Sequence, residues 1–281
     1  MPTLIILILI SLAGCSRQPA HTNEVVSFPV TEVPLNPGDS SWNRAPVHVA
    51  KLLLQDLVEP RLMKASTPEV QVRSLNNGTE IAFRLDWTDP SLNDLPGPGR
   101  FLDGCAIQIH GKIEANPPDP QMGAAAQQVE ITFWRADWQA SVNGRKDTIQ
   151  SLFPNAAVDH YPFEAQSLEH GSAAQREMAK RYAPADAVGN RRVGPRQFPV
   201  EDLIAEGPGS LAPNPNGASR GLGSRSKDGW TVVLKRRYPQ GLTPKVRTQI
   251  AFAVWEGSAQ EAGARKMRSA WVPLAVREGR Q

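Results

Sequence analysis

Residues 117–139 read PPDPQMGAAAQQVEITFWRADWQ, and they join a proline-rich loop to a segment of alternating side chains. Prolines forbid helix and fix an extended backbone, so the loop that leads to Met122 is stiff. After the loop, alternate residues fall on two faces: Val129, Ile131 and Phe133 on one, and Glu130, Thr132 and Trp134 on the other. This period of two, with β-branched and aromatic residues, predicts a β-strand over residues 129–134.

Met122 is the residue of this stretch that could carry chemistry. Its thioether is held on a stiff loop beside a strand rich in aromatic residues, and it could act as a soft metal ligand facing an apolar cavity. A methionine is also a common filler of gaps in a hydrophobic core. The residues alone therefore leave two interpretations of Met122 open, a metal ligand and a core residue.

The same alternation recurs along the chain and predicts an all-β fold. Residues 69–75 and 80–87 flank Asn76-Asn77-Gly78, a turn signal typical of a β-hairpin. Further strands are expected over residues 47–54, 106–110, 230–237, 249–255 and 269–276, and a short helix over residues 173–182. Residues 150–225 are rich in proline and glycine, and we expect long loops there that wrap a ligand or a partner. Antiparallel strands with long loops and one or two short helices predict a β-sandwich.

Composition and cysteine usage exclude several classes of function. The net charge of +3 is nearly balanced, which gives nucleic-acid binding little support. The two cysteines, Cys15 and Cys105, form no Cys-x-x-Cys-His motif, so covalent attachment of a c-type haem is excluded, and they are too few for an iron–sulfur cluster. Cys105 is expected to be a small buried residue. No nucleophile–base set or carboxylate pair stands out that would indicate an enzyme in its own right.

The first residues indicate export and lipidation. The apolar run in residues 1–14, MPTLIILILISLAG, is too short to span a bilayer, which needs about 20 residues, and it is typical of a secretory signal. Leu12-Ala13-Gly14-Cys15 resembles the bacterial lipobox, which implies cleavage before Cys15 and a lipid on its thiol. A plain signal peptide cut elsewhere is the alternative.

These features divide the chain into three parts. We expect a lipoprotein signal peptide over residues 1–14, a flexible tether over residues 15–39 and a folded domain over residues 40–281. The lipid would anchor the domain to a membrane on its periplasmic or cell-surface side.

Short motifs spread along the chain carry a resemblance to a known family. In order they are Trp42-x-x-Ala45, Phe101-x-Asp103 before Ala106-Ile107-Gln108, Met122-Gly123, Val129-x-Ile131-x-x-Trp134-x-Ala136-Asp137, Asp159-x-Tyr161, Glu206-Gly207, Trp230-x-Val232-Val233, Ala251-Phe252-Ala253-Val254-Trp255 and Lys266-x-x-Ser269-x-Trp271. No single motif is specific, but the ordered set over residues 40–278 resembles the haem-binding gamma subunit of ethylbenzene dehydrogenase. That family also includes the gamma subunits of dimethyl sulfide dehydrogenase, selenate reductase and chlorate reductase.

The resemblance implies a fold, a cofactor and its ligands. It implies an immunoglobulin-like antiparallel β-sandwich that holds one haem b non-covalently, with Met122 and Lys266 as the two axial ligands of the iron. Such an iron has no open site for oxygen or substrate, so the haem would only transfer electrons. Lys266 would have to bind as a neutral amine, because an unperturbed lysine is protonated at neutral pH. Lys235 and His110 remain alternatives to Lys266.

The function that the resemblance implies is that of an exported, lipid-anchored electron carrier. Its partners would be the iron–sulfur beta subunit and the molybdopterin alpha subunit of a DMSO reductase-family enzyme, or a membrane or soluble cytochrome, and catalysis would reside in the partner. Arg135 or Arg236 could pair with the haem propionates, or simply be solvated at the surface. The alternative is a haem-free β-sandwich lipoprotein that binds a carbohydrate or a protein, because sandwich folds host many functions.

Overall fold

The computed structural model describes residues 22–110, 115–118, 120–146, 153–155, 172–182, 196–244 and 247–279. Its strands are β1 (Val25–Pro29), β2 (His48–Lys51), β3 (Leu53–Leu54), β4 (Glu69–Asn76), β5 (Glu80–Thr88), β6 (Gly104–His110), β7 (Val129–Arg135), β8 (Val200–Ala205), β9 (Ala212–Pro213), β10 (Arg220–Arg225), β11 (Gly229–Arg237), β12 (Arg247–Trp255), β13 (Met267–Arg268) and β14 (Val272–Val276). The helical segments are α1 (Ala136–Val142), α3 (Ala173–Tyr182) and the 3-10 helices η1 (Ser40–Arg44) and η2 (Gly257–Ala259).

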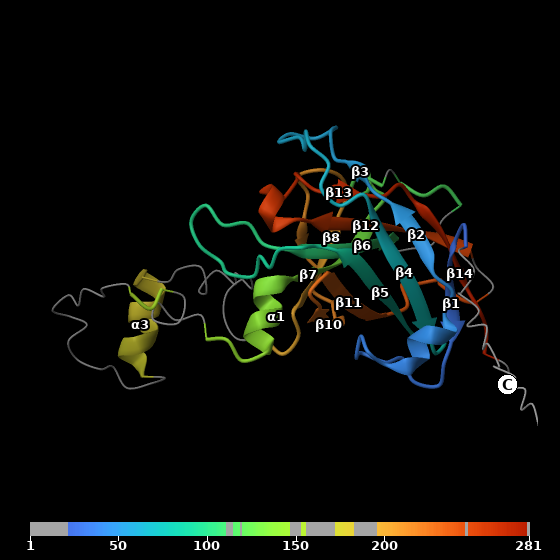
Figure 1. Ribbon diagram of the computed structural model, residues 1–281, viewed down its shortest axis with the longest axis horizontal. Helices are drawn as coiled ribbons and strands as arrows, with labels where there is room; N and C mark the ends of the chain where they lie inside the picture. The colour runs from blue at the N-terminus through green and yellow to red at the C-terminus, as the bar shows by residue number, and fades with distance from the viewer. Residues whose placement is uncertain are drawn as a thin grey trace, which may run out of the picture.

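The strands form a β-sandwich whose two layers are joined along one edge (Figure 1). Hydrogen bonds link one layer in the order β10-β11-β5-β4-β1 and continue into the other in the order β14-β12-β6-β7-β8-β9. The pairings along this path are antiparallel except those of β1, which runs parallel to both β4 and β14. The main hydrophobic core lies between the layers, where Phe83 of β5 and Leu234 of β11 share one cluster with Ile107 of β6 and Phe252 of β12. The predicted all-β sandwich is confirmed.

The predicted hairpin at Asn76-Asn77-Gly78 joins β4 to β5, as expected. Asn77 Oδ1 accepts hydrogen bonds from the backbone N–H groups of Thr79 and Glu80, and Gly78 has a φ of 90°, which favours glycine. Along β5 the alternation holds, because Phe83 enters the main core while Ala82 packs in a separate cluster on the outer face. The period of two in the sequence therefore predicted both faces of this strand correctly.

The tether predicted over residues 15–39 is wrong from residue 22 onward. β1 lies in the middle of the hydrogen-bonded path, where Val25 pairs with Leu274 of β14 and Ser27 pairs with Ser74 of β4. The segment VVSFP was missed because its first three residues are all buried, so it shows no alternation. Folded structure thus begins well before residue 40.

The loops predicted over residues 150–225 include three strands, β8, β9 and β10. β10 has the sequence RGLGSR, and its glycines allow a close approach of the two layers. A Cβ at Gly221 would lie 2.3 Å from Val200 Cγ1, and one at Gly223 would lie 2.6 Å from the Trp134 ring. A strand that needs glycine for packing lacks the apolar pattern by which strands are recognised.

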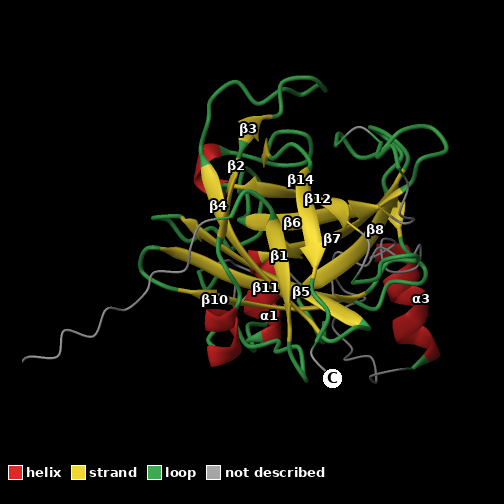
Figure 2. Cartoon of the chain, turned by 90° about the vertical axis from the view of Figure 1, so that its right-hand side faces the viewer, coloured by secondary structure: helices red, strands yellow, loops and turns green. Residues whose placement is uncertain are grey.

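Among the described residues, α1 packs beside β7 and β10, whereas α3 lies farther from the sandwich (Figure 1); both are drawn in red in Figure 2. α3 was predicted over the residues where it occurs, whereas α1 was not expected at its position. α1 starts directly after β7, and no side chain caps its first turn, so the sequence carries no start signal there.

The predicted signal peptide, the predicted lipidation site at Cys15, and Asp159 and Tyr161 of the motif set lie outside the described residues. Among the residues that are described, no helix has the length and apolar character needed to cross a membrane.

Candidate functional site

A cavity of about 580 Å³ lies on the outer face of the layer formed by β12, β6 and β7. Its floor consists of alternate residues of three neighbouring strands: Ala106 and Gln108 of β6, Ile131 and Phe133 of β7, and Ala251, Ala253 and Trp255 of β12. The three alanines leave space above the sheet, and the floor is mostly apolar. The volume falls within the roughly 300–1,000 Å³ that is typical of small-molecule sites.

Met122 and Lys266 both line this cavity. The Met122 carbonyl accepts a hydrogen bond from the N–H of Gly207, which follows β8, whereas Lys266 directly precedes β13, which pairs with β12. β12 and β8 are three strands apart in the layer, or about 14 Å at the usual strand spacing. The two side chains therefore reach the cavity from different sides of its floor.

Met122 is held in an unusual backbone conformation. Its φ is 72°, and Gly123 follows with a φ of 84°. Gly123 must be glycine, because a Cβ there would lie 2.7 Å from the Gln127 carbonyl oxygen and 3.0 Å from that of Ala205. A non-glycine residue in the left-handed region costs about 1–3 kcal/mol, and such residues cluster at functional sites. The partly buried Met122 packs against the outer-face cluster that includes Ile131.

Lys266 enters the cavity from a tight turn. The backbones of Ala262 and Arg265 pair in a single antiparallel β-bridge, which closes the turn that contains Gly263. The Lys266 carbonyl accepts a hydrogen bond of 3.1 Å from the Gln55 N–H. Its Nζ lies 5.3 Å from the centre of the Trp255 ring. Burial, together with the charge of Arg268, lowers the pKa of the Lys266 amine to about 8. The amine is thus much closer to its neutral, ligating form than an ordinary lysine.

Neither alternative ligand lines the cavity. Lys235 is buried on the other layer, where its Nζ donates to the Val33 carbonyl at 2.8 Å and pairs with Glu80 at 2.9 Å. His110 is buried at the end of β6, with its ring 5.0 Å from the centre of the Trp271 ring. The structure brings Lys266, and not these two residues, into one cavity with Met122.

Three arginines line the cavity: Arg100, Arg135 and Arg268. Arg135 is engaged by Asp137, at 2.5 and 2.6 Å, and by the Trp138 ring. The Nε of Arg268, in contrast, is buried and has no hydrogen-bond partner among the described residues. Arg236 lies elsewhere, buried and paired with Glu130, and burial lowers its pKa to about 10.

Arg268 was not predicted as a cavity residue, although its position relative to Lys266 indicates it. Lys266 and Arg268 are two residues apart, so they share one face of an extended segment, and Met267 between them is buried in the main core. Two tryptophans of the motif set have separate places: Trp255 lines the cavity, whereas Trp134 belongs to the main core. Cys105 is fully buried, as expected.

The donor set of the cavity fits a haem. A thioether and a partly deprotonated amine are available as ligands, the floor is mostly apolar, and the Arg268 guanidinium, whose buried Nε has no partner among the described residues, could receive a carboxylate. The lining also includes the aromatic side chains of Phe101, Phe133 and Trp255.

Several known proteins are similar to this chain. The model of the family described as ethylbenzene dehydrogenase matches residues 39–267, a range that covers the cavity residues apart from Arg268 and Ser269. A protein of Haloferax mediterranei, provisionally named a respiratory nitrate reductase heme subunit, is 21% identical over 99% of this chain and 81% of its own length. Chlorate reductase subunit gamma of Ideonella dechloratans is 23% identical over 80% of this chain and 72% of its own length.

Among solved structures, a carbohydrate binding module of family 9 from Caldicellulosiruptor kristjanssonii, in complex with cellotriose, matches 92% of this chain and 94% of its own. The TM-score is 0.44 and the sequence identity 9%.

Proposed function

Because the chain belongs to the ethylbenzene dehydrogenase family, we propose that it is an electron-transfer subunit that binds one haem b non-covalently in the cavity lined by Met122 and Lys266. The observation that carries this proposal is that a thioether and a lysine amine, from segments far apart in the sequence, line one apolar cavity. The names of both sequence relatives support it, since one is a heme subunit and the other a reductase gamma subunit.

Each residue of the cavity has a role in this proposal. The Met122 thioether and the neutral Lys266 amine would hold the haem iron, and Phe133 and Trp255 would shield the haem from water. Bound haem would supply one-electron transfer, and an iron ligated by both side chains would leave no open site for substrate chemistry. Arg268 would hold a carboxylate of the haem.

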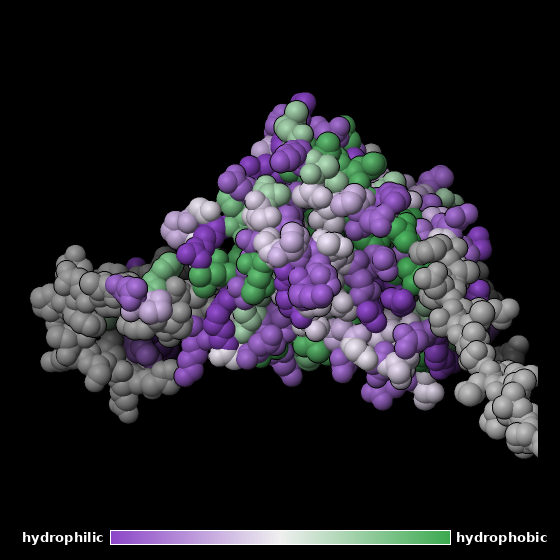
Figure 3. All heavy atoms as spheres, viewed as in Figure 1, coloured by the Kyte–Doolittle hydropathy of each residue, from purple (hydrophilic) through white to green (hydrophobic). Residues whose placement is uncertain are grey.

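We further propose that the partner is a molybdenum enzyme with an iron–sulfur subunit, and that catalysis resides there. The relatives' names, a nitrate reductase heme subunit and a chlorate reductase gamma subunit, support a reductase partner. Leu57 and Met63 are exposed, by 57% and 80%, in the loop after β3, and Val58 and Glu59 of the same loop line the cavity. Apolar residues are visible at the surface over β3 and this loop (Figure 3), which offers a contact surface close to the haem.

Export and a lipid on Cys15 complete the proposal. Anchoring at the periplasmic or cell-surface face of a membrane would keep the carrier at a high effective concentration near a membrane-bound partner.

Titration of the purified full-length chain with haemin tests the cofactor. We expect one haem per chain, a sharp low-spin spectrum on reduction, and extraction of unmodified haem b by acid and an organic solvent. A haemin Soret band that neither shifts nor sharpens in the presence of the chain would instead support the alternative function, a haem-free module for a carbohydrate or a protein.

Haem affinity should depend on pH through Lys266. Because its pKa in the haem-free chain is about 8, ligation below that pH must displace a proton, so affinity should fall about tenfold per pH unit below 8 and level off above it. Competition with a haem acceptor protein at several pH values on both sides of 8 measures this slope. In the Lys266→Ala variant, haem affinity should no longer change with pH in this way. If the haem affinity of the parent chain does not depend on pH, lysine ligation is contradicted.

Replacing Arg268 with glutamine should weaken haem binding and leave the ligand pair intact. A hydrogen-bonded ion pair to a charged group contributes about 1.5–3 kcal/mol, so affinity should fall by about tenfold to a hundredfold while the low-spin spectrum persists. Arg247→Gln is a matched control, because Arg247 is exposed and pairs with Glu24. Equal affinities of the Arg268→Gln variant and the parent would rule out this carboxylate contact.

A further inference from the structure

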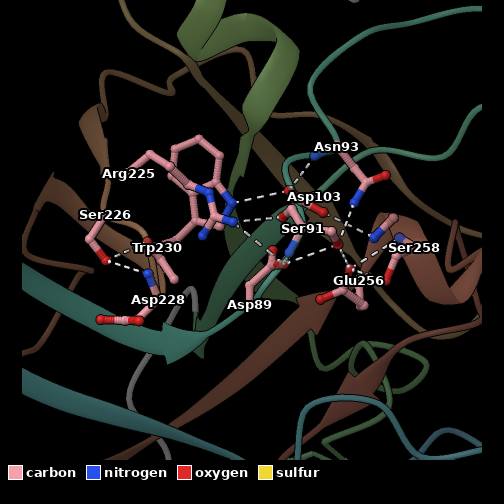
Figure 4. Close-up of polar contacts among 12 residues, drawn as sticks. Asp89, Ser91, Asn93, Asp103, Arg225, Ser226, Asp228, Trp230, Glu256 and Ser258 are labelled. Carbon is pink, nitrogen blue, oxygen red and sulfur yellow. Dashed lines mark hydrogen bonds and ion pairs between the residues drawn. The ribbon is translucent and has the colours of Figure 1, made fainter.

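Three buried carboxylates meet where three strands end. Asp89 follows β5, Asp103 precedes β6, and Glu256 follows β12. Their side chains converge from these separate segments (Figure 4), and one oxygen atom of each lies within 4.8 Å of the others. This cluster belongs neither to the lining of the haem cavity nor to the proposed electron-transfer ligands.

The cluster carries more negative charge than its surroundings balance. Among the described residues, Arg225 forms an ion pair with the cluster. Its nearest guanidinium nitrogen lies 3.9 Å from Asp89 Oδ1. Buried charges in proteins are normally paired or bound to a metal ion.

Hydrogen bonds fix the carboxylates but leave one oxygen without a partner. Asp103 accepts hydrogen bonds from the backbone N–H groups of Asn93 and Gly257 and from Trp230 Nε1. Glu256 Oε1 accepts a hydrogen bond from the Ser258 N–H. Asp89 Oδ1 accepts from the Ser91 N–H at 2.9 Å. Asp89 is fully buried, and its Oδ2 accepts no hydrogen bond from any described residue. A buried carboxylate oxygen without a partner is costly, which points to a missing ligand.

We propose that Asp89, Asp103 and Glu256 bind a calcium ion. The donors are all oxygen atoms, which hard cations prefer, and no histidine or thiol among the described residues joins the cluster. Calcium binds oxygen at about 2.3–2.6 Å, so two of its ligands can lie up to about 5 Å apart, whereas magnesium, at about 2.0–2.1 Å, allows only about 4 Å. The cluster oxygen atoms lie within 4.8 Å of one another, a spacing that calcium can bridge, whereas magnesium usually keeps several of its waters rather than entering a site made of protein ligands.

The ion would join two walls of the haem cavity. The loop between Asp89 and Asp103 carries Phe101 and Leu102, which line the cavity. On the other side, the Glu256 N–H donates to Glu261 Oε2 at 2.9 Å, and Glu261 lines the cavity just before the turn that leads to Lys266. Calcium would thus hold the segment that presents Lys266. Calcium binding itself does not depend on haem, so it is tested on the haem-free chain.

Thermal unfolding of the haem-free full-length chain, first treated with EDTA and then supplied with calcium chloride, tests the proposal. At roughly a hundredfold excess of calcium over its dissociation constant, the melting temperature should rise by roughly 5–10 °C. Magnesium chloride at the same concentration should give a smaller rise. No rise with calcium would overturn the proposal.

Variants of the cluster test whether the rise in melting temperature comes from calcium bound by these carboxylates. Asp89→Asn and Glu256→Gln should abolish the rise, and in EDTA they should melt no lower than the parent, because each removes one of the mutually repelling charges. Asp228→Asn is the matched control: its side chain is exposed, although its backbone carbonyl accepts a hydrogen bond from the Asp89 N–H. Retention of the calcium response in both cluster variants would overturn the proposal.

Terbium luminescence gives a second measurement on the parent chain, independent of whether the variants fold. Trp230 Nε1 lies 3.1 Å from Asp103 Oδ2, so tryptophan excitation should sensitise a terbium ion bound in the cluster. Calcium should displace that emission, whereas magnesium should do so weakly. Emission that calcium does not displace would contradict a calcium site.

Discussion

Met122→Ala should convert the bound haem from six-coordinate to five-coordinate and lower its midpoint potential by on the order of 0.1 V or more, within the roughly 0.8 V range that axial ligands span. The thioether is the ligand that favours the reduced iron, and alanine leaves that position empty. Optical spectra of both oxidation states and a redox titration measure the change.

Two further variants make the Met122 result specific. Met63→Ala removes a methionine that is 80% exposed on a loop beside the cavity, so its spectrum and potential should match the parent. Met122→His should restore a low-spin spectrum at a lower potential, since imidazole also ligates haem iron and histidine tolerates the φ of 72° at this position. An unchanged spectrum and potential in Met122→Ala would refute Met122 as a ligand.

Lys266→Arg should abolish the low-spin spectrum almost as completely as Lys266→Ala. Arginine keeps the positive charge and the length of the side chain, but the guanidinium stays protonated and has no lone pair to offer the iron. The arginine variant therefore separates ligation from charge. Low-temperature electron paramagnetic resonance of the oxidised protein should show high-spin iron in both variants.

Lys235 provides the decisive comparison for this lysine. Its ammonium pairs with Glu80 on the other layer, so Lys235→Ala should lose some stability and keep the parent's spectrum. If only the Lys235 variant changes the spectrum, the assignment of Lys266 is wrong.

Local patterns predicted the parts of the fold that are stabilised locally. The β4–β5 hairpin follows from the Asn-Asn-Gly turn, and the two faces of β7 follow from alternation: Ile131 belongs to the cavity face and Trp134 to the main core. β1 and β10 could not be predicted in this way. β1 is buried between two strands that it meets only in the tertiary structure, and β10 owes its glycines to contacts with Val200 and Trp134.

The candidate site was predictable only in part. The residues gave no reason to pair Met122 with Lys266, and that pair came from the family resemblance; the structure adds that both line one cavity. The carboxylate cluster was missed because Asp89, Asp103 and Glu256 lie at the ends of three separate strands. No spacing in the sequence brings them together, and only the register of the two layers does.

A crystal structure of the haem-loaded chain, with an anomalous map at the iron absorption edge, tests the central claim most directly. The account predicts a single iron peak in the cavity above Ala106 and Ala253, within bonding distance of Met122 Sδ and Lys266 Nζ. An iron peak outside this cavity, or one ligated by His110 or Lys235 in place of Lys266, would contradict it.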